Sequence, residues 1–195
     1  MKVQMKKLLA TTALMAGLLA PLANAADYVI DTKGAHASIN FKIKHLGYSW
    51  LTGRFDRFDG KFNYDTANVS DSKIEVSIDT SSVNTNHAER NKHLKSGDFL
   101  EVNKFAEAKF VSTAITDKGN DKLEIKGTLS LHGVSKDIVI DAVKVGEGKD
   151  PWGGYRVGFT GSTTLTLKDF AIKMNLGPAS TQVIMNLNIE GIRAK

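Results

Sequence analysis

The chain contains no cysteine, so disulfides, thiolate nucleophiles and cysteine-based metal sites are excluded. Beyond its first 25 residues it also lacks any apolar run approaching the ~20 residues that a membrane-spanning helix needs. No block of like charge is present in that part of the chain. Because nucleic-acid binding usually depends on a basic patch or stripe, we expect no nucleic acid among the partners.

The common catalytic motifs are missing as well. The sequence has no H-E-x-x-H or H-x-x-E-H spacing, no G-x-S-x-G elbow and no glycine-rich phosphate loop. His87 and His93 are six residues apart, about 240° around a helix, so they cannot jointly hold an ion there. The other histidines considered, His45 and His132, lie on separate segments. The sequence therefore predicts no metal site, no covalent cofactor and no enzyme activity.

The first 25 residues have the pattern of a secretory signal peptide. A lysine-containing start precedes an apolar run from Leu8 to Leu22, and Ala23-Asn24-Ala25 forms an A-x-A cleavage site. An uncleaved anchor is the alternative, but Pro21 interrupts an already short run. Without the three lysines of this leader the basic residues fall from 26 to 23 against 21 acidic ones, a net charge of +2. We expect a signal peptide at 1–25 and an exported, periplasmic domain at 26–195.

Most of this domain has the alternation of half-buried strands. Residues 37–44, for example, place Ala37, Ile39, Phe41 and Ile43 on one face. No βαβ rhythm is present, so the sheet should be antiparallel, and one apolar face per strand without covering helices favours closure into a barrel of about eight strands. A two-sheet sandwich with a solid core is the alternative. The expected strands cover 27–30, 37–44, 51–64 (with a bulge or bend), 73–79, 109–113, 122–131, 138–142, 155–167 and 183–189.

One segment, residues 84–110, departs from this pattern. Its polar first half predicts a short helix over 86–95, with Asn84, Thr85 or Asn86 as N-cap and Gly97 as the stop. Arg90 and His93 share one face of this helix. They could bond backbone groups and pin the helix to the barrel rim, or meet a polar ligand head, and the two interpretations are compatible.

The order of several short motifs resembles the YceI-like family of periplasmic proteins. The matching blocks span the whole exported part: His45-Leu46-Gly47, Gly53-Arg54-Phe55, Phe58-Asp59-Gly60-Lys61-Phe62, Arg90, His93-Leu94-Lys95-Ser96, Asp98-Phe99 and Gly127-Thr128-Leu129-Ser130-Leu131-His132-Gly133-Val134. The resemblance implies an all-β fold, a single extended eight-stranded antiparallel lipocalin-like barrel with one short helix insertion. It also implies a bound isoprenoid lipid of the polyprenyl or quinone type. The sequence departs from the family pattern at Asn91 (Asp expected), Ala106 (Pro expected) and Ala171 (Gly expected).

The expected binding site follows from the apolar faces and the helix. The lipid tail should lie against Phe41, Ile43, Leu129, Val157, Phe159, Met185 and Leu187, and the polar head near His45, Arg90 or His93. Gly127, Gly161 and Ala142 on the same faces suggest spare volume. Burying a tail of roughly 40 carbons at ~0.8 kcal/mol per CH₂ would give ~30 kcal/mol relative to water. This exceeds the ~18–21 kcal/mol ceiling of real affinities, so a bilayer is the proper reference and a carrier is favoured.

Other functions remain open at this point. One is a non-catalytic, stress-related interaction module with a packed interior, and another is an accessory to membrane quinone or redox enzymes. An enzyme acting on a lipid head group would need a nucleophile, a metal or an acid–base pair that the sequence does not show. Transient membrane contact and a homodimer are further expectations.

Overall fold

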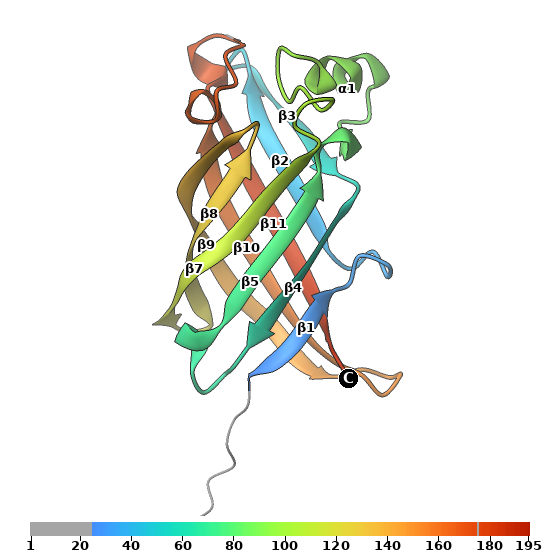
Figure 1. The fold of residues 1–195 in the computed structure, drawn as a ribbon, viewed down its shortest axis with the longest axis vertical. Helices are drawn as coiled ribbons and strands as arrows, with labels where there is room; N and C mark the ends of the chain where they lie inside the picture. Colours follow the sequence, from blue (N-terminus) through green and yellow to red (C-terminus); the bar gives the residue numbers. More distant parts are fainter. Residues whose placement is uncertain (1–24, 175) are drawn as a thin grey trace, which may run out of the picture.

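The computed structural model describes residues 25–174 and 176–195, so the leader predicted at 1–25 lies outside the described residues except for Ala25. The described part is dominated by strands (Figure 1). The strands are β1 (Ala26–Ile30), β2 (Ser38–His45), β3 (Ser49–Phe55), β4 (Phe58–Tyr64), β5 (Lys73–Asp79), β6 (Val83–Asn84), β7 (Glu107–Gly119), β8 (Lys122–Leu131), β9 (Val134–Lys149), β10 (Tyr155–Thr166) and β11 (Gln182–Arg193). The α-helix α1 (Ala88–Lys95) accompanies four short 3₁₀ turns at 69–71, 80–82, 167–170 and 178–180.

These strands form a closed antiparallel barrel. Pairing runs in the order β1-β4-β5-β7-β8-β9-β10-β11, and β11 pairs back to β1. Nearer to α1, β2, β3 and β6 continue the paths of β1, β4 and β5, so β11 pairs with β2 through 183–188 and with β1 through 191–193. Across the described residues the wall therefore has eight members. The predicted eight-stranded barrel is confirmed, and the sandwich alternative is wrong.

The predicted strand at 51–64 bends in its middle. Asp56 and Arg57 separate β3 from β4, and each half has different neighbours. The bend is held by backbone hydrogen bonds from Asp56 to Ser82 and from Asp79 to Arg57, and by an Arg57–Asp79 ion pair. The two-residue break lets rings on both halves, such as Phe55 and Phe62, face inward, so the predicted bulge or bend is confirmed.

Strands β7 and β9 are longer than predicted. The β7–β8 turn lies at Asn120 and Asp121. Both residues have positive φ (54° and 61°), which Asn and Asp tolerate better than most residues. The register of β7 shifts between Ser112 and Ala114, opposite Gly127.

The helix matches its predicted position but not its predicted caps. His87 is the N-cap, and its Nδ1 accepts a hydrogen bond from the Arg90 amide; Asn84, Thr85 and Asn86 do not cap the helix. The helix ends at Lys95 with Ser96 as C-cap, one residue before Gly97. No helix in the described residues is long and apolar enough to cross a membrane.

The departures from the family pattern have local consequences. Asn91 accepts two hydrogen bonds from Thr85 through Oδ1, as an aspartate could. The Ala106 carbonyl accepts the amide of Thr80. Ala171 has φ 57°, a left-handed conformation that costs a non-glycine residue about 1–2 kcal/mol. Of the three departures, only Ala171 has a backbone conformation that is unfavourable for its residue type.

Candidate ligand-binding cavity

The barrel encloses a cavity of about 590 Å³. Its volume lies within the ~300–1,000 Å³ range of small-molecule sites. Every described strand contributes residues to its lining, together with α1 and the loops around it. The lining is overwhelmingly apolar, and its polar members are His45, Thr52, Asn63, Ser72, Thr85, Arg90, His93, Thr160 and Thr163. A cavity of this size contradicts an interior packed solid.

Nine of the ten predicted site residues line the cavity: Phe41, Ile43, His45, Arg90, His93, Leu129, Phe159, Met185 and Leu187. Val157 points inward but is 0% exposed in the core cluster and does not line the described cavity. Its partner in β11 is Gly191, close to the stacked rings of Tyr28 and Phe62. The ligand contacts themselves stay predictions.

Three inward glycines accommodate aromatic rings. A Cβ at Gly53 would lie 2.3 Å from the ring of Phe41. At Gly127 the nearest ring atom, of Phe110, would be 2.4 Å away, and Phe62 crowds Gly191 in the same way. The rings therefore lie against the backbone rather than projecting into the lumen. The expectation of spare volume is wrong at Gly127, whereas Gly161 and Ala142 do line the cavity.

The two ends of the cavity differ. At the end where the chain terminates, called here the terminus end (Figure 1), Phe62, Tyr64 and Phe159 close the interior with edge-to-face contacts. Burial raises the pKa of Tyr64 above its ordinary value. At the other end, called the helix end, His45 and His93 line the cavity and are exposed to solvent. The cavity therefore opens towards α1.

Arg90 and His93 at the helix end already have protein partners. The Arg90 guanidinium donates from Nε to the Thr85 hydroxyl (2.9 Å) and from Nη2 to the Thr85 carbonyl (2.8 Å). His93 Nε2 lies 3.0 Å from Asp98 Oδ2, and its ring packs edge-on against Phe99. Both sets of contacts stay within the 84–110 segment, so pinning of the helix to the barrel rim stays a prediction. Contact with a ligand head stays a prediction, although both side chains also face the cavity.

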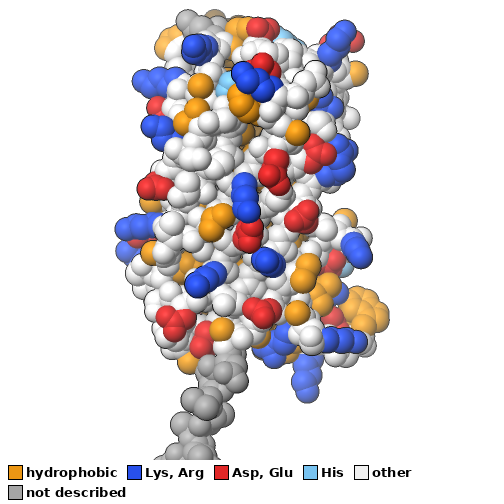
Figure 2. Space-filling model, in the orientation of Figure 1, with side chains coloured by type: hydrophobic (Ala, Val, Ile, Leu, Met, Phe, Trp, Pro, Cys, Tyr) orange, Lys and Arg blue, Asp and Glu red, His pale blue; other side chains and the backbone are white. Residues whose placement is uncertain are grey.

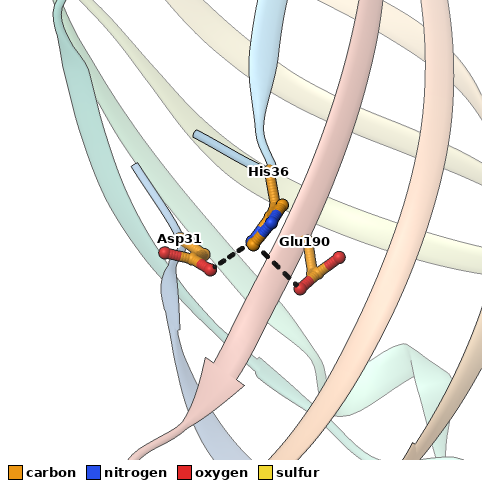
Figure 3. Close-up of side chains that lie close together, drawn as sticks. All are labelled: Asp31, His36 and Glu190. Carbon is orange, nitrogen blue, oxygen red and sulfur yellow. Dashed lines mark hydrogen bonds and ion pairs between the residues drawn. The ribbon is translucent and has the colours of Figure 1, made fainter. Parts of the chain in front are cut away.

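The wall also holds an ionic cluster that the sequence did not predict. His36 Nδ1 lies 2.9 Å from Asp31 Oδ2 and 3.8 Å from Glu190 Oε1 (Figure 3). These groups are close enough together to hold a metal ion, but Arg156 Nη1 contacts both carboxylates. Hydrogen bonds from Arg156 and His36 lower the pKa of Asp31 to about 2. The guanidinium already supplies the balancing charge, so the cluster is an ion network that joins segments of the wall.

No short-range sequence signal could have found this network. Its members come from the β1–β2 connection, β10 and β11, and Asp150, which bonds Arg156 Nε, lies in the β9–β10 loop. Only the strand register brings them together.

With the fold and cavity in view, comparison with known proteins identifies the family. The YceI-like domain matches residues 28–191. The chain belongs to the YceI-like family. A UPF0312 protein of Shewanella denitrificans is 63% identical over 190 residues, covering 97% of this chain and 100% of that protein. UPF0312 proteins of Shewanella baltica are 57% identical over the same proportions.

Solved structures with this family's fold agree with the barrel. The Campylobacter jejuni YceI protein is 32% identical, with a TM-score of 0.70 over 79% of this chain and 91% of that chain. A polyisoprenoid-binding domain from Saccharophagus degradans is 18% identical, with a TM-score of 0.64 over 88% of this chain and all of the other. At that identity the second likeness shows the fold alone.

Proposed function

We propose that this protein is a periplasmic carrier that encloses one long isoprenoid lipid, of the polyprenyl or quinone type, and exchanges it with membranes. The observation that carries the proposal is the apolar cavity of about 590 Å³ inside the barrel, which reaches exposed residues at the helix end and is closed by aromatic rings at the terminus end. The Saccharophagus degradans domain, which shares the fold, is described as polyisoprenoid-binding. The leader pattern at 1–25 supports export.

The orientation of the lipid follows from the distribution of polar groups. The tail would extend towards Leu129, Phe159 and the aromatic closure, where apolar side chains replace the acyl chains of a bilayer. The head would remain near His45, Arg90 and His93 at the mouth. Because the cavity is about as apolar as a membrane interior, the net preference for either would be small, which permits exchange. Binding rather than catalysis is the proposed activity, because among the described cavity-lining residues no hydroxyl is hydrogen-bonded to a histidine or a carboxylate.

The test uses a matched pair of tryptophan substitutions on β10. Gly161 lines the cavity, and a Cβ there would meet only Ile140 Cγ2 closely, at 3.1 Å. Gly161→Trp should therefore fill the lumen, while Ser162→Trp adds the same side chain on the exposed outer face of the next residue. Organic extracts of both variants and of the unmodified protein are compared by mass spectrometry, with folding checked by circular dichroism.

We expect at least fivefold less lipid per protein in Gly161→Trp and an unchanged amount in Ser162→Trp. The mass of the extracted lipid would identify the chain length and distinguish a polyprenyl compound from a quinone. Equal lipid in folded Gly161→Trp would place the ligand outside the cavity. No lipid in any of the three proteins, even after incubation with polyprenyl or quinone lipids, would contradict the carrier proposal.

A further inference from the structure

The hairpin between β2 and β3 exposes three large apolar side chains beside the mouth of the cavity. Leu46 is 54% exposed, Tyr48 88% and Trp50 46%, and these three residues are called the apolar tip. His45 and Leu51, next to them in sequence, line the cavity. The tip therefore lies at the helix end, where a ligand would enter (Figure 1).

The turn chemistry of this hairpin does not explain Leu46. Leu46 and Gly47 both have positive φ (51° and 87°), and the Tyr48 amide donates to the His45 carbonyl. Asn or Asp is favoured at the first of two such positions, because a leucine side chain is disfavoured in the left-handed region. The β7–β8 turn at the opposite end follows that preference with Asn120 and Asp121. Leu46 is thus unfavourable for the turn and contributes little to the core.

Unpaired lysines accompany the apolar tip. The Nζ atoms of Lys42 and Lys44 lie 5.0 and 5.7 Å from the centre of the Trp50 ring. Four more lysines belong to α1 and the 167–181 segment at the same end: Lys92, Lys95, Lys168 and Lys173. Within the described ranges none of these six forms an ion pair with a carboxylate. Of the acids on the same segments, Asp98 and Glu101 are paired with His93 and Lys104, which leaves Glu89 and Asp169 against the six lysines. Figure 2 shows lysine and arginine side chains beside hydrophobic ones around this end.

We propose that the apolar tip docks onto the surface of a bilayer that carries anionic head groups. Tryptophan and tyrosine favour the interfacial region of a bilayer, and lysines beside them are attracted to anionic lipids. This combination of rings and free positive charge fits a lipid surface better than a second copy of the chain, whose own helix end would present the same lysines and repel them. Docked in this way, the mouth faces the bilayer and a lipid tail enters the barrel without crossing water. The inference rests on the proposed carrier function and adds its route of loading.

The experiment measures binding to vesicles for variants at the two ends of the barrel. Sedimentation with phosphatidylcholine vesicles containing 30% phosphatidylglycerol is compared for the unmodified protein, Leu46→Asn, Trp50→Thr and Trp152→Ser. Trp152 is the matched control, because it is 79% exposed and lies beside Arg156 in the β9–β10 loop at the terminus end. The N-terminus of each preparation is read by mass spectrometry, so that all four share the same processed form.

We expect Leu46→Asn and Trp50→Thr to lower the partition coefficient at least fivefold, while Trp152→Ser leaves it unchanged. Binding should weaken in 0.5 M NaCl and on vesicles of phosphatidylcholine alone. Leu46→Asn should also keep or raise the melting temperature, because asparagine suits the turn, which separates lost docking from lost folding. Equal losses in Trp50→Thr and Trp152→Ser, or no vesicle binding by the unmodified protein, would overturn the proposal.

Two further measurements distinguish membrane docking from the carrier function itself and from self-association of the protein. Protein stripped of lipid should take up lipid from vesicles more slowly in the tip variants, but the amount bound after long incubation should be unchanged, because these variants leave the cavity intact. Vesicle binding without any extractable lipid would contradict the carrier function while leaving the docking surface in place. A dimer that dissociates in Leu46→Asn, seen by analytical ultracentrifugation without vesicles, would assign the tip to self-association and overturn membrane docking.

Discussion

Single residues shape the cavity by controlling where aromatic rings lie. Gly53 is paired with Phe41 across β2 and β3, and the absence of a Cβ lets the ring rest against the strand. The rings of Phe110 and Phe62 rest in the same way against Gly127 and Gly191, although these residues are not direct strand partners. Glycine weakens a strand, but here it keeps large rings out of the lumen.

This relation predicts that Gly53→Ala destabilises the protein. An added methyl group would lie 2.3 Å from the Phe41 ring, so the ring must move into the cavity or the strands must separate. We expect the free energy of unfolding to fall by about 1–3 kcal/mol, measured by urea denaturation. Gly146→Ala is the control, because a Cβ there meets nothing within 4 Å. Adding Phe41→Leu to Gly53→Ala should recover part of the loss; unchanged stability in Gly53→Ala would contradict this account.

For single residues, the sequence predicted which face of a strand a side chain lies on better than it predicted what surrounds that side chain. Alternation in strands places Phe41, Leu129 and Val157 on the inner face, and all three lie there. It does not say how far along the barrel a residue lies, so Val157 among the packed rings could not be distinguished from a cavity residue. The volume at Gly127 was misjudged for a related reason, since its space is filled by a ring from the neighbouring strand β7.

At the scale of elements, the interruption between β1 and β2 is a weak point that the ionic network reinforces. The chain leaves the wall at Asp31 and returns by Ser38, and β1 contacts β11 through only three register pairs. Asp31 is 5% exposed, and its carboxylate contacts Arg156 of β10. The Asp31 amide also donates to the Glu190 carbonyl of β11. The network therefore connects the β1–β2 segment to the neighbouring strands β10 and β11 by ion pairs and hydrogen bonds.

This network predicts a loss of stability in acid. The pKa of Asp31 is about 2 in the folded protein, below the ~3.9 of an unfolded chain. A lowered folded pKa stabilises the protein above pH ~4, and the stabilisation disappears as the pH falls towards 2. The contribution is on the order of 1–2 kcal/mol. Asp31→Asn should lower stability at pH 7 and flatten its decline between pH 4 and 2, measured by denaturation at each pH.

The exposed Asp59 of β4 provides the comparison for that experiment. Asp59→Asn removes the same charge from a side chain that lies outside the network. It should preserve the stability at pH 7 and the acid decline of the unmodified protein. An equally steep decline in Asp31→Asn would show that other groups cause the acid sensitivity.

The elements themselves were predictable to different degrees. The helix position followed from the polar run before Leu94, but its N-cap did not, because His87 caps with an imidazole nitrogen rather than a hydroxyl or carboxylate. The ends of β7 and β9 extend beyond the alternating core, where exposed positions carry no pattern. The long-range strand register that brings the Asp31 network together cannot be predicted from any short stretch of the sequence.

At the scale of the whole molecule, an occupied cavity should stabilise the fold. A ligand that binds only the folded state adds about 2.7 kcal/mol when its concentration is 100 times its Kd. For a protein of this length that corresponds to a rise of about 5–10 °C in melting temperature. We expect protein stripped of lipid to melt lower than protein as purified, and reloading to restore the difference, measured by calorimetry. Gly161→Trp should show no such rise on reloading; identical melting of stripped and reloaded unmodified protein would contradict an internal ligand.

The position of β11 has a consequence for the order of assembly. This last strand pairs with β2 along its first half and with β1 at its end, so contacts between the two ends of the chain close the wall. A chain that has not yet been completed must leave the edges of β1, β2 and β10 unpaired. Closing contacts so distant in sequence also slow folding, because the whole intervening chain must first be ordered. The cavity therefore exists only after β11 has paired with β1 and β2, and a lipid can be enclosed only after β11 has been synthesised.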